Sequence, residues 1–192
     1  MDVKMNRFLT FLLTAVCIVC CGTEQFNDGF ERCKADKRGI PQPVGWNLDR
    51  LSKNATVRLA RESGCARNGI FGLLAETDVG GQIYFRTLPS FKVAPGDNIE
   101  MKIHARGSGR YRLLYYVYGT DDPQKTAFIQ TIGFGKPKGT KETDWELYTA
   151  KGKFAVPSKA KGKFTQFALR PVIFVYGDSE ITFDDFSLKI SK

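Results

Sequence analysis

The chain has 192 residues, of which 42% are hydrophobic and 12% aromatic, with 29 Lys and Arg against 20 Asp and Glu and a single His. This length is enough for one domain with a sizeable core, and it leaves no room for a catalytic domain beside it. The formal net charge of +9 favours anionic partners such as acidic glycans or envelope phosphates, and the single histidine argues against a transition-metal site.

The first 21 residues have the pattern of an export signal. Lys4 and Arg7 precede the apolar run Phe8–Val19, which is short for a membrane span. Two processing routes fit: lipidation of Cys20 or Cys21, which would tether the protein to a bacterial membrane, or cleavage without a lipid. We therefore predict a protein that is secreted or anchored in the cell envelope, and export makes nucleic acid the least favoured anionic partner.

Two cysteines, Cys33 and Cys65, remain beyond the signal. Cysteines in an exported chain usually pair, so we predict a disulfide between them. The bridge would close a loop of about 30 residues and stabilise the fold by about 3 to 4 kcal/mol in the chain-entropy model.

Residues 22–192 read as a single domain of short strands. Runs of β-branched and aromatic residues alternate with clusters of Gly, Pro, Asp and Asn, and no segment has convincing helical periodicity, although residues 48–61 come nearest. This pattern predicts an all-β antiparallel sandwich. The predicted strands are Ala55–Leu59, Gly69–Ala75, Gln82–Leu88, Asn98–Arg106, Arg110–Tyr118, Thr126–Phe134, Trp145–Ala150, Phe164–Val175 and Glu180–Ile190.

Alternation along these strands predicts which side chains leave the core. In residues 99–106 the apolar set is Ile99, Met101, Ile103 and Ala105, and in residues 112–118 either Tyr115 or Tyr116 with Tyr118 faces outward. Aromatic rings pack on the C–H face of a sugar, and guanidinium and amide groups bond its hydroxyls. The alternative is an ordinary solvated sheet face. The candidate glycan-binding residues are Tyr84, Arg86, His104, Arg106, Tyr116, Gln166 and Arg170.

The last predicted strand contains two adjacent acids, Asp184 and Asp185. Their carboxylates repel each other, so solvent, a basic partner or a hard cation with oxygen ligands must compensate. The residues alone leave these three options open.

Five short motifs occur in an order that resembles the CenC-type carbohydrate-binding modules, a jelly-roll group with the galactose-binding-domain-like fold. The resemblance spans about residues 26–190. The motifs are Gly29-Phe30-Glu31, Gly45-Trp46, Val93-Ala94-Pro95-Gly96-Asp97, Asp144-Trp145 with Phe154-Ala155-Val156-Pro157, and Phe183-Asp184-Asp185-Phe186-Ser187-Leu188.

The resemblance implies a jelly roll whose concave sheet binds a glycan, with Trp46 and Trp145 packing the fold. It also implies a structural Ca²⁺ ion away from the sugar groove, held by Glu31 and by Asp184 or Asp185, with Asp185 preferred. Such an ion would tie the two ends of the chain together. The competing interpretation is a salt bridge from these acids to Arg32 or to a lysine.

The function that these features predict is that of a non-catalytic exported protein which binds a glycan or polysaccharide. The sequence has no serine-nucleophile elbow, and adjacent strand residues such as Asp184 and Asp185 point to opposite faces, which argues against a glycosidase pair. Modules of this kind usually accompany an enzyme, so a separate glycan-active enzyme is a predicted partner. The alternative is a cell-envelope module that binds protein or anionic polymers through the lysine-rich segments 136–141, 151–153 and 159–163, which read as loops. A weaker third option is a glycan-cleaving jelly roll such as a lyase.

Overall fold

The computed structural model describes residues 23–35, 39, 41–62, 64–122 and 125–192. The predicted signal and its cysteines lie outside the described residues. None of the described residues forms a helix long and apolar enough to cross a membrane. The elements are β1 (Glu24–Asp28), β2 (Cys33–Ala35), β3 (Pro41–Pro43), β4 (Trp46–Leu51), β5 (Ala55–Ala60), β6 (Gly72–Thr77), β7 (Ile83–Thr87), β8 (Phe91–Val93), β9 (Asn98–Asp122), β10 (Lys125–Gly133), β11 (Lys138–Lys153), the 3₁₀ turn η1 (Ser158–Ala160), β12 (Gln166–Val175) and β13 (Ser179–Ser191).

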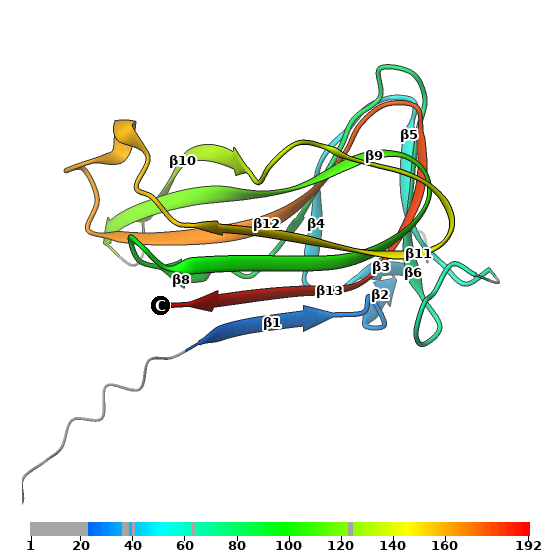
Figure 1. The fold of residues 1–192 in the computed structure, drawn as a ribbon, viewed down its shortest axis with the longest axis horizontal. Helices are drawn as coiled ribbons and strands as arrows, with labels where there is room; N and C mark the ends of the chain where they lie inside the picture. Colours follow the sequence, from blue (N-terminus) through cyan, green and yellow to red (C-terminus); the bar gives the residue numbers. More distant parts are fainter. Residues whose placement is uncertain (1–22, 36–38, 40, 63, 123–124) are drawn as a thin grey trace, which may run out of the picture.

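Strand β9 holds the architecture together because it belongs to both layers of the fold. It runs along the molecule, bends over and returns (Figure 1). The bend falls at Gly107 and Gly109, whose φ angles of 119° and 139° are unfavourable for any other residue. A β-carbon at Gly107 would also collide with the carbonyl oxygen of Glu180 on β13. The two strands predicted for residues 98–106 and 110–118 are therefore the two halves of one bent strand.

The two layers are antiparallel sheets that share β9, which confirms the predicted jelly-roll sandwich. In the first sheet, the early half of β9 pairs with β13 on one side and with β11 on the other, and β13 pairs further with β6 and β1, while β5 pairs with β6. In the second sheet, the later half of β9 pairs with β12 and β10, β12 pairs with β7 and β8, and β4 pairs with β7.

The hydrophobic core fills the space between the two sheets. The predicted set Ile99, Met101, Ile103 and Ala105 is buried there, beside Phe183 of the neighbouring strand β13. Trp46 is also buried, as predicted; its ring stacks on Phe85 at 5.0 Å, and its Nε1 donates a hydrogen bond to Asp28 Oδ2 at 3.1 Å. Trp145 differs from the prediction. It lies half-buried where β11 bulges away from β9, outside the core cluster.

Several segments differ from their predicted structure. Strand β5 confirms the strand predicted at Ala55–Leu59, but β4 and the short strands β1, β2, β3 and β8 were not predicted. Residues 69–71 form no strand. Two of the lysine-rich segments predicted as loops lie in β11 instead. Residues 138–141 begin this strand and pair with residues 108–111 of β9, and residues 151–153 end it and pair with residues 98–100. Alternation between Lys and Gly obscured this strand in the sequence.

The predicted disulfide is absent, since Cys33 and Cys65 are both free thiols in the described structure. Cys33 lies on the exposed ribbon of β2 and β3, and Cys65 lies in the loop before β6, half-buried. Hydrogen bonds from this loop to Glu31, described below, attach it to the opening segment of the chain instead.

Candidate functional site

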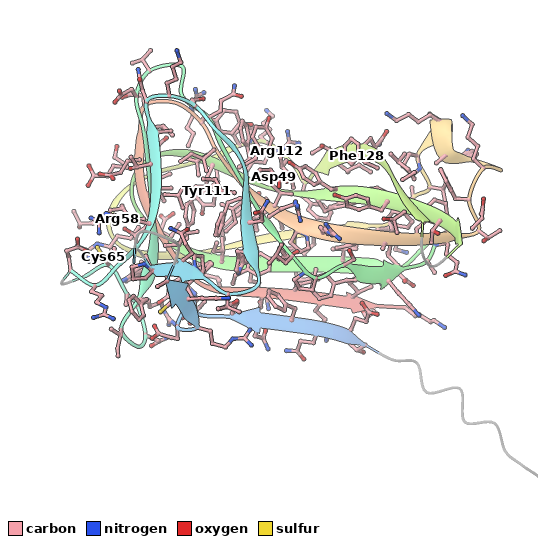
Figure 2. The ribbon with its side chains drawn as sticks, turned by 180° about the vertical axis from the view of Figure 1, so that it is seen from behind. Asp49, Arg58, Cys65, Tyr111, Arg112 and Phe128 are labelled. Atoms are coloured by element: carbon pink, nitrogen blue, oxygen red, sulfur yellow. The ribbon has the colours of Figure 1, made fainter. Side chains whose placement is uncertain are left out.

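The second sheet has apolar side chains on both of its faces, and the outer face forms a cluster separate from the core. Leu114 of β9 with Val172 and Phe174 of β12 make its buried centre, and Tyr84, Tyr116 and Tyr176 pack around them. We call this surface, together with Tyr118, Phe128, Arg86 and Arg170, the aromatic face. In Figure 2 the labelled Asp49, Arg112 and Phe128, on β4, β9 and β10, lie along this side, away from the end of the molecule where Arg58 and Cys65 lie.

The strand register sets the aromatic side chains in rows across the sheet. Tyr84 lies opposite Phe174, with ring centroids 4.4 Å apart, and Tyr118 lies opposite Phe128, with centroids 5.9 Å apart. Phe128 also meets Tyr116 edge-on at 5.5 Å. Phe128 remains 56% exposed, although it is a large apolar side chain. An exposed ring held by neighbouring rings presents a flat apolar surface to a ligand.

Two arginines on the face are fixed by local contacts. Arg86 Nε lies 2.7 Å from both Oδ1 and Oδ2 of Asp49, a half-buried pair, and Asp49 itself occupies a bulge in β4. Arg170 Nε donates to Ser90 Oγ at 2.7 Å, and its guanidinium lies 5.0 Å from the centroid of Tyr118. Arginine has five N–H donors in a rigid plane, so both groups retain donors for a ligand.

Tyr116 lies at the middle of the face, opposite Arg170. Desolvation raises the pKa of its phenol to about 12, and the nearby Asp49, Tyr84 and Tyr118 act in the same direction. The hydroxyl is therefore neutral near physiological pH, where it can both donate and accept a hydrogen bond.

The structure brings together four of the seven predicted glycan-binding residues: Tyr84, Arg86, Tyr116 and Arg170. Gln166 begins β12 and lies at the end of the sandwich, where it lines a depression of about 330 Å³ with residues of β8 and β13. It is apart from the four.

His104 and Arg106 do not belong to this face, which corrects the prediction. They lie on the early half of β9, in the first sheet, so their outward direction is that of the opposite side of the molecule. There Arg106 Nη1 donates to the carbonyl oxygen of Gly64 at 3.2 Å, and the loop of residues 64–71 covers the strand. The bend at Gly107 separates both residues from Tyr116.

Sequence reasoning missed several residues of this face. Phe174 and Tyr176 stand in a strand whose two faces are both apolar, so alternation does not tell which side is the core. Asp49 lies at a bulge, and Phe128 lies beside one, where alternation breaks. Alternation did indicate that either Tyr115 or the pair Tyr116 and Tyr118 faces outward. In the structure Tyr116 and Tyr118 face outward and Tyr115 enters the core.

The predicted meeting of the chain ends does occur, on the other side of the molecule. Strand β1 pairs with β13, and a β-carbon placed on Gly29 would lie 3.6 Å from Asp185 Oδ1, 3.7 Å from Asp184 Oδ1 and 4.0 Å from Glu31 Cγ. β13 bulges between Asp184 and Ser187, and Asp185 has a φ of 49°. Both aspartates therefore turn toward the same loop instead of opposite faces.

This loop, residues 64–71, binds all three acids. Glu31 Oε1 accepts hydrogen bonds from the backbone N–H groups of Ile70 and Phe71, both at 2.9 Å. Asp184 Oδ2 accepts from the N–H groups of Arg67 and Asn68 at 2.8 and 3.0 Å. Gly69 has a φ of 76°, which favours glycine, and a β-carbon there would press against the Glu31 carboxylate.

The same acids were the predicted calcium ligands. Arg67 Nη1 lies 2.7 Å from Asp185 Oδ2, and Asn68 Nδ2 lies 2.6 Å from the same oxygen. Within the described ranges no three acids, histidines or cysteines are arranged to hold a metal ion. As arranged, the donor set does not fit calcium, because N–H groups or a guanidinium already bind Glu31 Oε1, both oxygens of Asp184 and Asp185 Oδ2. The calcium ion stays a prediction, and the predicted salt bridge is made by Arg67 rather than by Arg32 or a lysine.

His104 lies beside this cluster, with Nδ1 3.8 Å from Asp185 Oδ2 and without a hydrogen-bond partner among the described residues. Burial lowers the pKa of its imidazole, and the positive charge of Arg67 lowers it further, while Asp185 opposes the shift. The ring is therefore held neutral, as part of the packing beneath the loop.

Comparison with solved structures supports the fold. The CBM22-1 xylan-binding domain of Paenibacillus barcinonensis Xyn10C is similar to this chain at a TM-score of 0.50 and 14% identity, covering 87% of this chain and 94% of that one. The CBM22-1 and GH10 modules of the Clostridium thermocellum endo-1,4-beta-D-xylanase 10B, complexed with xylohexaose, match at a TM-score of 0.51 and 14% identity, covering 85% of this chain and 28% of that one. No protein-family model matches the sequence, and a search of curated proteins finds no significant match. The protein thus has the jelly-roll fold of carbohydrate-binding modules.

Proposed function

We propose that this protein is a non-catalytic, exported carbohydrate-binding protein that binds a polysaccharide chain on the aromatic face. The observation that carries the proposal is the surface itself: open aromatic rings and fixed guanidinium groups lie in rows on one sheet. The rings pack against the apolar side of a sugar, and the guanidinium and phenol groups form hydrogen bonds with its hydroxyls. The fold shared with a xylan-binding domain adds support and makes xylan the first probe.

The chemistry of the face favours binding over cleavage. A glycosidase of the usual kind uses two carboxylates about 5 to 9.5 Å apart, one of which must take or give a proton. The carboxylate beside this face, Asp49, has both oxygens bound by Arg86. A bound glycan would then be presented to a separate glycan-active enzyme, and a membrane lipid on Cys20 or Cys21 would hold the complex at the envelope.

The test is titration of the purified protein with xylo-, manno-, gluco- and galacto-oligosaccharides. We expect at least one neutral series to bind, and Phe128→Ala to weaken that binding about tenfold, since stacking of a ring on a ligand contributes about 1 to 1.5 kcal/mol. Leu147→Ala is the matched control, because Leu147 is 54% exposed and lies on β11 of the other sheet.

A second pair of variants tests the placement of the site. Arg170→Ala should weaken binding, whereas Arg106→Ala should leave it unchanged, since Arg106 lies on the opposite side. Equal effects of both arginines, or binding that depends only on salt concentration, would favour the envelope module with lysine-rich contacts instead. Release of shorter products would favour a lyase.

A further inference from the structure

The outer side of the first sheet carries lysines at neighbouring register positions around one acid. Glu100 of β9 lies between Lys189 of β13 and Lys151 of β11, and Lys102 follows two residues along β9. Lys153 stands in the next row, opposite Asn98. Paired residues of an antiparallel sheet point to the same side, so these side chains share one surface. We call it the lysine face. Figure 1 shows its strands β13, β9 and β11 side by side, with β1 at the edge.

The positive charge of this face is fixed. Glu100 binds Lys102 Nζ and Lys151 Nζ, each at 2.6 Å, and these bonds lower the pKa of its carboxyl to about 2. The acid is therefore always ionised and offsets a single lysine, which leaves a net charge of +3 over the four lysines and Glu100. Lys153 and Lys189 are exposed and form no ion pair with any residue in the described ranges. Their ammonium groups stay available to a ligand.

The surface between these lysines is hollow, and charged and polar side chains line most of it. A depression of about 420 Å³ is lined by Glu100, Lys151, Lys153 and Lys189 together with Asn98 and Ser191. Neutral side chains with hydrogen-bonding groups continue the same rows, since Ser187 and Thr149 flank Lys102. On β1, Gln25 lies opposite Lys189. Ammonium groups thus alternate with hydroxyls and amides over adjoining strands.

We propose that the lysine face binds an acidic polysaccharide, a glycan chain that carries carboxylate groups, at a site independent of the aromatic face. Neighbouring strands are about 4.8 Å apart, so a chain lying across them meets an ammonium, an amide or a hydroxyl on each strand except at Glu100, whose carboxylate is bound by Lys102 and Lys151. The lysines neutralise the carboxylates as point charges, and the amides and hydroxyls bond the sugar hydroxyls.

Other polyanions fit this face less well. Phosphate is recognised in a bidentate way by arginine, and single-stranded nucleic acid also stacks on aromatic rings. The lysine face is built from lysine, serine, threonine, asparagine and glutamine instead. A membrane surface would favour apolar side chains beside the lysines to enter the lipid, and Leu147, one row beyond Lys102, stands alone in that role among the described neighbours.

The test measures the affinity of the protein for polygalacturonate, a polymer of uronic acids, at low and at physiological salt. The variant pair Lys153→Glu and Lys189→Glu reverses two lysines of the face. The matched control reverses Lys161 and Lys163, which are equally exposed in the turn after η1 and change the net charge by the same amount. We expect the first pair to weaken binding about tenfold or more and the control pair to weaken it less than about threefold.

Equal losses in the two double variants would overturn the proposal, because they would show attraction to the whole cationic molecule. No binding to polygalacturonate would overturn it too. Binding to anionic phospholipid vesicles, but not to polygalacturonate, with sensitivity to Lys153 and Lys189 would replace it with a membrane surface. Phe128→Ala should leave the affinity for polygalacturonate unchanged, and the Lys153→Glu and Lys189→Glu double variant should leave the affinity for neutral glycans unchanged. The proposals for the lysine face and for the aromatic face can therefore fail independently of each other. Thermal unfolding confirms that each variant is folded.

Discussion

Replacing Asp184 with alanine should release the loop of residues 64–71 and destabilise the whole domain. The Asp184 side chain is fully buried and accepts three backbone hydrogen bonds, from Arg67 and Asn68 at Oδ2 and from Asp185 at Oδ1. Each hydrogen bond to a charged acceptor contributes about 1.5 to 3 kcal/mol net, and water can replace part of these three because they are only partly buried, so we expect a loss of about 3 to 5 kcal/mol. A domain of this size is stable by about 5 to 15 kcal/mol, so the loss is large.

Two milder changes set the scale. Asp184→Asn keeps the shape and one acceptor oxygen but turns an amide N–H₂ toward N–H donors, which should cost about 1 to 2 kcal/mol. Burial raises the pKa of Asp184, so the loss of its charge is itself not a penalty. Asp185→Asn weakens the ion pair with Arg67 and the exposed hydrogen bond from Asn68 Nδ2. The side chains of Asp185 and Arg67 are 28% and 40% exposed, so the substitution should cost less than about 1 kcal/mol.

The assay is urea unfolding followed by tryptophan fluorescence, which reports on Trp46 in the core beside Asp28. The expected order of the unfolding midpoints is wild type, Asp185→Asn, Asp184→Asn and Asp184→Ala, from highest to lowest. An Asp184→Ala protein as stable as Asp185→Asn would refute the reasoning, because the three N–H groups would then have found other partners at no cost. If Asp184→Ala does not fold, the gap between the two asparagine variants still tests it.

Three other outcomes follow from the same geometry. Arg67→Ala should increase the thermal shift that calcium causes relative to wild type, since it removes the cation that now occupies Asp185, and an unchanged shift measured by calorimetry would contradict this. Stability should fall as the pH drops from about 6.5 through the lowered pKa of His104, because the unfolded state then binds a proton that the folded state excludes; His104→Gln should abolish that part of the decrease in urea midpoints. Gly107→Ala should cost about 3 kcal/mol or more in urea unfolding, since its φ is 119° and a β-carbon would meet the Glu180 carbonyl; a loss below about 1 kcal/mol would show that the bend can move.

Alternation in the sequence was a reliable guide wherever one face of a strand is polar. Ile99, Met101 and Ile103 enter the core as predicted, and so does Ile83 of β7. It failed where the surface is itself apolar or the strand bulges, which is why Phe174 and Asp49 were missed. Hydrophobicity marks burial, but a ligand-binding surface made of rings carries the same signal as a core.

The error at His104 and Arg106 has a different physical origin. Alternation correctly placed both side chains away from the core. It tells which face of its own strand a side chain is on, but it does not tell on which side of the whole molecule that face lies. Because β9 turns over at Gly107, the outward sides of its two halves face opposite directions. The glycine pair at positions 107 and 109 was the one visible sign of the bend.

The meeting of Glu31 with Asp184 and Asp185 was predicted from the resemblance, and the structure brings them together around Gly29. Their partner was not predictable, since Arg67 lies in a loop with no periodic pattern and is distant in the sequence. Register across the sheet was equally hidden, so the grouping of Lys189 with Lys151 around Glu100 appears only in three dimensions.

The double membership of β9 has a consequence for how the chain reaches its native state. Neither sheet can form completely before residues that are far apart in the sequence come together. β9 pairs with the last strand, β13, and the first strand, β1, pairs only with β13 among the described strands. Closing such long loops costs entropy before the contacts return it, so folding should be slow, on the millisecond to second scale typical of β-sandwiches. In the folded protein neither sheet can unfold without the other, because both contain β9. The amide protons of both sheets should therefore exchange with solvent together, in a single cooperative event.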